Sequence, residues 1–90
     1  MDHRYDLIRP MYERGNISKL SDIFKFIPKT TVFRDLGYRL DRGNELIEHP
    51  EDFPVRKLFE MAAYAGLTEE EILRLMLQEY LYRKEIRLGK

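Results

Sequence analysis

The fold of this chain is decided by residues 30–50, TTVFRDLGYRLDRGNELIEHP. Apolar side chains recur at helical spacing before Gly37, and glycine most easily adopts the left-handed conformation with which many helices end. Thr30 or Thr31 can supply a hydroxyl to cap the first amides of this segment. The pattern therefore predicts a short helix that a threonine begins and Gly37 closes.

A second short helix is predicted after a tight turn over residues 38–40. Asp41 is a suitable N-cap, the apolar pair Leu46-Ile47 supplies a buried face, and Pro50 stops the helix at about His49. Gly43 is unusual inside a helix, because an interior glycine costs about 0.5–1 kcal/mol relative to alanine. A glycine in such a place indicates close backbone approach or weak helicity.

Two supporting helices are predicted downstream, over about 54–66 and 68–82. Pro54 suits the first position of the former, and Gly66 ends it. The run Thr68-Glu69-Glu70-Glu71 is a capping box, in which the threonine hydroxyl and the last glutamate satisfy each other's backbone amides. This is the best-specified helix start in the sequence.

Upstream, the spacing predicts a helix over about 4–13, with a break or bend at Pro10, and another from Ser18 to Pro28. Ser18 is expected to accept hydrogen bonds from the first-turn amides of that second helix. At 90 residues the chain is expected to form one domain, 1–90. The predicted fold is all-α, with five to six short helices, a helix-turn-helix core at about 30–49 and an extended C-terminal helix.

The last helix carries more apolar residues than one core contact requires. A core stripe is predicted at Ile72, Leu73, Met76, Leu77 and Tyr80. Leu75, Tyr82 and Ile86 extend onto another face, which predicts either a homodimer through this helix or simple coverage by the chain's own tail.

Composition narrows the function classes. The chain has no cysteine, which excludes disulfides and thiolate chemistry. No apolar run is long enough for a signal sequence or a membrane span, so a cytoplasmic location is expected. Sixteen basic residues balance sixteen acidic ones, but residues 25–42 carry three excess positive charges and residues 45–52 carry only acidic ones.

The helical segments resemble a known family in order and spacing. Asp35-Leu36-Gly37, Leu46-Ile47-Glu48-His49-Pro50, Ala62-Ala63-Tyr64-Ala65-Gly66-Leu67 and Thr68-Glu69-Glu70-Glu71-Ile72-Leu73 stand where the phage-repressor (Cro-like, lambda-repressor-like) helix-turn-helix family has its helix ends. The resemblance covers about half of the chain. The sequence departs from the family by one extra residue between Gly37 and Ile47, by Gly43 at an apolar position, and by Pro50 where glycine is customary.

This resemblance implies a small transcriptional regulator that binds double-stranded DNA, with a recognition helix over about 41–49 in the major groove. The implied contact residues are Lys29, Thr30 and Thr31 at phosphates, Arg39 and Arg42 at guanine edges or phosphates, and Asn44 at adenine. Simpler roles remain open for each: helix capping for the threonines, neutralisation of the arginines by Asp41 and Glu45, and solvation for the asparagine.

An enzyme and a protein-interaction module are the two other classes of function. An enzyme is not expected, because His3 and His49 are the only histidines and no metal-ligand spacing, catalytic constellation or phosphate loop accompanies them. No cofactor is expected either. The alternative to DNA binding is a protein-interaction module, such as an adaptor, an antitoxin-like protein or a phage accessory protein. Pairing of Arg39 and Arg42 with neighbouring acids would favour that alternative.

Overall fold

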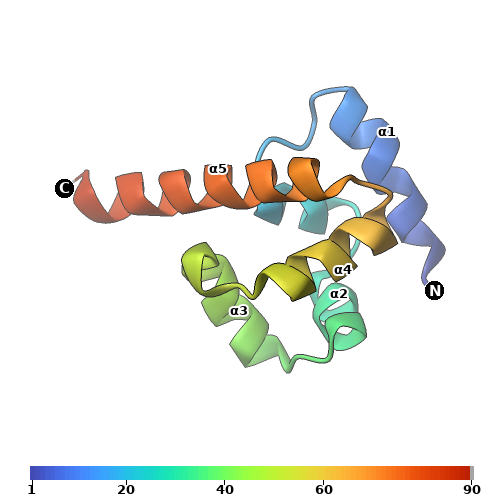
Figure 1. Ribbon diagram of the computed structural model, residues 1–90, viewed down its shortest axis with the longest axis horizontal. Helices are drawn as coiled ribbons and strands as arrows, with labels where there is room; N and C mark the ends of the chain where they lie inside the picture. The colour runs from blue at the N-terminus through green and yellow to red at the C-terminus, as the bar shows by residue number, and fades with distance from the viewer. Residues whose placement is uncertain (90) are drawn as a thin grey trace.

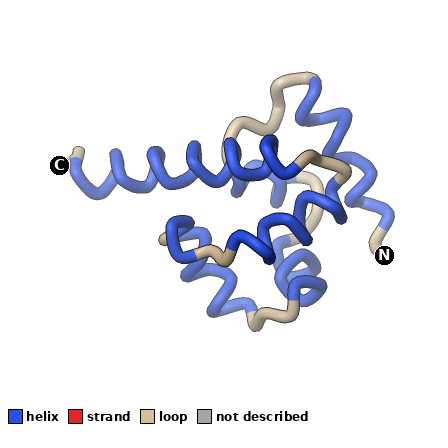
Figure 2. Tube along the Cα trace, viewed as in Figure 1, coloured by secondary structure: helices blue, strands red, loops and turns tan. Residues whose placement is uncertain are grey.

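The computed structural model describes residues 1–89, and within them the protein is all-α, without strands (Figures 1 and 2). Lys90, the last residue of the predicted domain 1–90, lies outside the described residues. The α-helices are α1 (Ile8–Glu13), α2 (Lys29–Leu36), α3 (Leu40–Glu48), α4 (Val55–Ala65) and α5 (Glu69–Leu88). Three 3-10 helices join them: η1 (His3–Leu7), η2 (Leu20–Lys25) and η3 (Pro50–Asp52).

The long helix α5 runs along one side of the molecule, and its C-terminal part projects beyond the other elements (Figure 1). It packs against α4, η2 and η3, while α2 packs against α3 and α4. The turn between α2 and α3 lies at the edge of the molecule opposite α5 (Figure 1). The pair α2–α3 is therefore held by α4, which connects it to α5.

One hydrophobic core joins these elements, and every α-helix contributes to it. Burial of such side chains is the main favourable term in folding. The largest fully buried apolar side chains are Tyr5, Ile8, Leu20, Ile23, Ile27, Phe33, Leu36, Leu46, Leu58, Met61 and Ile72.

The helix ends that depend on local signals are confirmed. Gly37 and Gly66 follow α2 and α4 in the left-handed region, with φ of 87° and 73°. The Thr68 hydroxyl accepts from the Glu71 amide at 3.1 Å, and the Glu71 carboxylate accepts from the Thr68 amide at 2.8 Å. These ends were predictable because glycine and capping side chains act within a few residues of themselves.

The predicted N-caps of α2 and α3 were wrong. Pro28 is the N-cap of α2, so Thr30 and Thr31 lie inside the first turn rather than before it. Arg39 is the N-cap of α3, and the Asp41 carboxylate instead accepts from the next backbone amide. Both helices therefore begin at least two residues earlier than predicted.

The N-terminal segments differ from prediction in detail. The predicted helix 4–13 changes from 3-10 to α between Leu7 and Ile8, and Pro10 lies in the first turn of α1, where a missing amide proton costs little. Ser18 donates its hydroxyl to Asp22 at 3.1 Å rather than accepting from amides. The helix that follows is the 3-10 helix η2.

Asp22 organises the start of η2. Its buried carboxylate accepts from the Ser18 and Lys19 amides at 2.9 and 3.2 Å and lies 3.1 and 3.3 Å from the ammonium groups of Lys19 and Lys25. Burial by itself raises the pKa of Asp22, but the hydrogen bonds from Ser18 and Lys19 outweigh it and hold the pKa well below its usual range.

We expect Asp22→Asn to lower the free energy of unfolding by about 1–3 kcal/mol at pH 7, because the amide cannot accept all of these donors. A lowered pKa in the folded state means that the unfolded state binds more protons below about pH 5. The carboxylate's contribution is therefore full at neutral pH and is lost as the pH falls. Urea unfolding at pH 7, 5, 4 and 3 should show the gap between wild type and variant closing, and a constant gap would refute the argument.

Helix α5 is longer than predicted and turns different faces inward. It continues to Leu88 rather than ending near residue 82. Leu75, assigned to the outer face, is buried at 2% exposure, whereas Leu77, assigned to the core, is 48% exposed. Within residues 1–89, no helix is long and apolar enough to cross a membrane.

Candidate nucleic-acid interface

Helices α2 and α3 pack unusually closely at Gly43. The glycine is buried in α3, and a Cβ atom there would overlap the ring of Phe33 in α2. Phe33 is itself fully buried. The close backbone approach that the interior glycine indicated is therefore the correct interpretation, and it fixes how α3 lies against α2.

The C-terminal end of α2 is tied to the rest of the domain by polar contacts. The Lys57 ammonium of α4 donates to the Leu36 carbonyl at 2.7 Å, which satisfies a free carbonyl at the helix end. The Tyr5 hydroxyl donates to the Asp35 carboxylate at 2.8 Å. Burial and this hydrogen bond raise the pKa of Tyr5 well above its usual range. These contacts hold the α2–α3 turn in place.

The predicted contact residues of α2 do not share one surface. Lys29 and Thr30 are exposed at its first turn, but Thr31 is buried at 6% exposure. This burial leaves little of the Thr31 surface for the expected phosphate contact. Helix α2 is about 12 Å long, so Lys29 lies at the end of the helix far from Arg39.

Both predicted arginines pair with acids. Arg39 Nε lies 3.5 Å from Asp41 Oδ1, and Arg42 donates to Glu45 at 3.1 Å. Asn44 is half-buried at the side of α3. The neighbouring acids thus neutralise the two side chains that were expected to read or hold DNA.

The outward face of α3 is acidic. Gly43, Leu46 and Ile47 form its buried side. At about 100° per residue, Asp41, Glu45 and Glu48 lie on the opposite side, and all three are exposed. Carboxylates on this face repel phosphate, so any nucleic acid on it must be held by the flanking basic side chains.

Three basic side chains of α2 and α4 were not among the predicted contact residues, and two of them are exposed. Arg34 follows Thr30 by one helical turn, and its side chain is 74% exposed with an acid no closer than 3.9 Å. Arg56 is exposed and Lys57 half-buried at the start of α4, and Lys57 contacts the end of α2. The spacing of four residues between Thr30 and Arg34 indicates that both lie on one face of α2, so the sequence could have identified Arg34. It could not have identified the α4 residues, because the contact of α4 with α2 depends on the tertiary fold.

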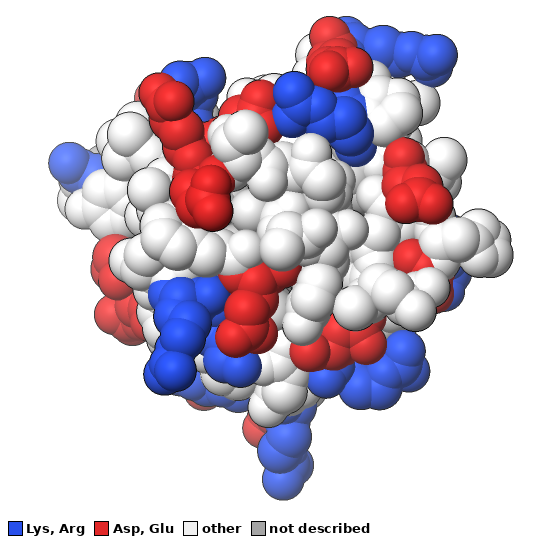
Figure 3. Space-filling model, turned by 45° about the vertical axis from the view of Figure 1, so that its right-hand side comes forward, with Lys and Arg blue, Asp and Glu red and all other residues white. Residues whose placement is uncertain are grey.

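Charge is mixed over the molecular surface. On the face that Figure 3 shows, basic and acidic side chains are interspersed, and neither sign forms a broad field. The described residues hold no group of three or more side chains suited to a metal ion.

In comparisons with known proteins, the chain matches no family model, and no curated protein or solved structure is similar enough to count as a match.

Proposed function

We propose that the protein binds duplex DNA through α2, the turn at Gly37 and α3, used as a helix-turn-helix. The observation that carries this proposal is the close packing of α3 on α2 through Gly43 and Phe33, with the turn exposed at one edge of the molecule. Under this proposal the exposed arginines near the turn, Arg34, Arg39 and Arg42, supply phosphate contacts beside α3, and Lys29 and Thr30 supply a separate set at the start of α2.

The ion pairs of the turn weaken this interaction without blocking it. The Arg39 and Arg42 side chains are 89% and 50% exposed, and their acidic partners are at least 66% exposed. Exposed pairs of this kind contribute about 0–1 kcal/mol, so a phosphate can replace the carboxylate. The acids lower the net attraction between the protein and the DNA phosphates. Binding to non-specific sequences is therefore expected only at low salt.

The first test is binding of the purified protein to a randomised duplex pool at low salt, followed by sequencing of the bound fraction. We expect enrichment of a defined site, and Arg42→Ala is expected to lower affinity for that site about 5- to 100-fold if the arginine reads a base. A matched control is Arg74→Ala, an exposed arginine of α5 paired with Glu70. No salt-dependent binding to any duplex would overturn the proposal.

A sharper test removes the carboxylate that pairs with Arg42. Glu45→Gln keeps the side-chain shape, frees Arg42 and removes a charge that repels phosphate. We expect this variant to bind the enriched site several-fold more tightly, with the gain shrinking as salt is raised. Unchanged affinity would place α3 away from the DNA.

The second candidate function is a protein-interaction module. Pairing of both arginines with acids and the acidic outward face of α3 favour it, because these features oppose contact with DNA. Under this candidate function neither the wild type nor Glu45→Gln binds DNA, and α5 binds the partner protein. The same binding experiment thus separates the two functions.

A further inference from the structure

The carbonyl ends of α2 and α3 are held in the same way, each by a basic side chain of a later helix. In α2, the Lys57 ammonium of α4 donates to the Leu36 carbonyl at 2.7 Å. In α3, Arg87 Nη1 of α5 donates to the Glu48 carbonyl at 3.4 Å, and the same nitrogen lies 3.3 Å from His49 Nδ1. Leu36 and Glu48 are the last residues of their helices, so their carbonyl groups have no acceptor role within the helix. Both helices of the candidate interface are thus completed from outside.

The end of α3 depends on this contact more than the end of α2 does. The last turn of α2 contains a basic residue of its own, Arg34, whereas the last turn of α3 contains none. A cation at the C-terminal end of a helix is favourable, because the helix dipole places partial negative charge there. Arg87 of α5 therefore supplies the charge that the sequence of α3 lacks.

A chain of polar contacts connects this end of α3 to the interior of the domain. Arg83, one turn before Arg87 in α5, lies with Nη1 3.8 Å from the Glu48 carboxylate and donates from Nε to Glu79 at 2.8 Å. The fully buried Glu79 carboxylate also accepts from the Ser21 amide at 2.8 Å. Glu79, Arg83 and Arg87 are spaced four residues apart and share one side of α5. Through this side, α5 links η2 to the last turn of α3.

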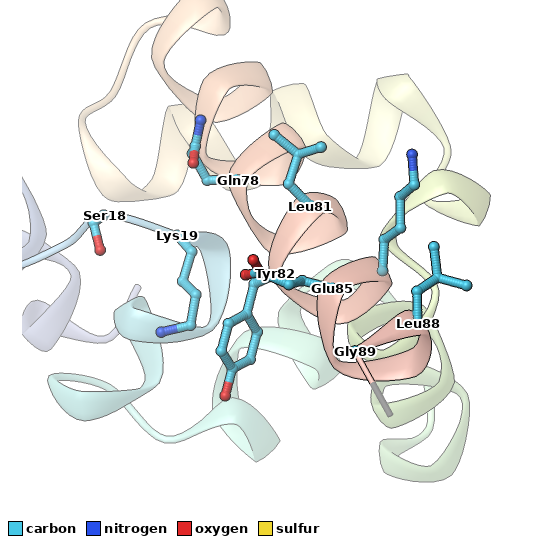
Figure 4. Close-up of a pocket in the computed structure, with 9 residues that line it drawn as sticks. Ser18, Lys19, Gln78, Leu81, Tyr82, Glu85, Leu88 and Gly89 are labelled. Atoms are coloured by element: carbon cyan, nitrogen blue, oxygen red, sulfur yellow. The ribbon is translucent and has the colours of Figure 1, made fainter.

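The last turns of α5 are not held by the core. Within the described residues, the buried residues of α5 are Ile72, Leu75 and Glu79, so none follows Glu79. Leu81 and Leu88 instead line an open groove of about 710 Å³ between α5 and the segment before η2 (Figure 4). The two arginines lie on a neighbouring side of the helix and reach α3. The contact with α3 is therefore what the projecting part of α5 contributes to the domain.

We infer that Arg87 is a positioning residue for α3, which holds the last turn of that helix in the orientation that Gly43 and Phe33 set further up. For DNA the inference rests on the proposed function, in which α3 lies in the major groove. A protein whose binding-competent conformation is only partly populated binds more weakly by that fraction. Arg87 thus acts on DNA affinity through α3, without touching the DNA.

Hydrogen exchange measured by NMR tests the contact in the free protein. The His49 amide donates to the Glu45 carbonyl at 2.9 Å in the last turn of α3, and Arg87→Ala is expected to raise its exchange rate about 2- to 10-fold. The Gly43 amide donates to the Arg39 carbonyl at the start of the same helix and serves as the internal reference. An unchanged rate at His49, or an equal change at both amides, would overturn the inference.

Two further variants separate position from charge. Lys57 shows that an ammonium group can hold a helix-end carbonyl, so Arg87→Lys is expected to restore most of the protection of the His49 amide. Lys84→Ala removes an equal charge from the same helix at the groove, and it should leave the exchange rate as in the wild type. An effect of Lys84→Ala as large as that of Arg87→Ala would show that charge alone acts, and would reject the positioning role.

Binding to the duplex enriched from the randomised pool tests the consequence for DNA. Arg87→Ala is expected to lower affinity about 2- to 10-fold, and Arg87→Lys to restore it. The slope of log affinity against log salt should stay as in the wild type, because a positioning residue releases no counterions. A direct phosphate contact would instead reduce that slope by about one. A reduced slope, or an unchanged affinity, would contradict the inference.

Failure of the proposed function is recognised separately from failure of this inference. If the wild type binds no duplex at low salt, the DNA proposal is wrong, and the exchange rate of the His49 amide still decides whether Arg87 holds α3. If the wild type binds DNA while Arg87→Ala changes neither exchange nor affinity, the proposed function stands and the positioning role is rejected.

Discussion

Substitution of Glu79 by alanine is expected to lower the free energy of unfolding by about 3–5 kcal/mol, the cost of breaking a buried ion pair. Glu79 is fully buried in α5, where its carboxylate accepts from the Ser21 amide at 2.8 Å and from Arg83 Nε at 2.8 Å. Without it, the first turn of η2 loses an acceptor, and the largely covered Arg83 guanidinium loses the closer of its two carboxylate partners and keeps only Glu48 at 3.8 Å.

Glu79→Gln is the control that separates charge from shape. The amide retains an oxygen for the Ser21 amide but no longer neutralises Arg83, so an intermediate loss is expected. Chemical unfolding followed by circular dichroism measures both variants. A loss below about 1 kcal/mol for the alanine variant would show that water or rearrangement replaces the carboxylate.

Gly43→Ala is the second large effect. Alanine normally stabilises a helix interior by about 0.5–1 kcal/mol relative to glycine. Here the added Cβ would overlap the Phe33 ring, and overpacking of a core costs about 1–3 kcal/mol. We therefore expect a net loss of stability and a displacement of α3 from α2.

A double-mutant cycle tests this explanation. Phe33→Leu removes ring atoms that the new methyl group would overlap, so Gly43→Ala should be less harmful in the Phe33→Leu background than in the wild type. Equal costs in both backgrounds would refute the contact. Glu45→Ala, at an exposed position of the same helix, controls for helix propensity.

The candidate interface was predicted only in part. Sequence spacing correctly indicated a helix, a left-handed Gly37 and a second short helix, and it placed Lys29, Thr30 and Arg42 at exposed positions. It misplaced Thr31, because the direction of a side chain in a first turn depends on where the helix begins. DNA binding itself stays a proposal, which the binding experiments test.

The sequence by itself determined the all-α class and the ends of α2, α4 and the start of α5. Gly37, Gly66 and the Thr68 capping box act through bonds and backbone angles within a few residues, so no distant partner is needed.

Only the tertiary structure decided which sides of the helices are buried and what the polar residues do. Gly43 is needed because the Phe33 ring of another helix leaves no room for a Cβ atom, and the buried Glu79 carboxylate accepts from the Ser21 amide, 58 residues away in the chain. Likewise Leu75 faces the core and Leu77 faces solvent because α5 lies against η2, η3 and α4. Periodicity shows that a helix has apolar stripes, but the neighbours that pack on it select which stripe becomes the core and which stays exposed.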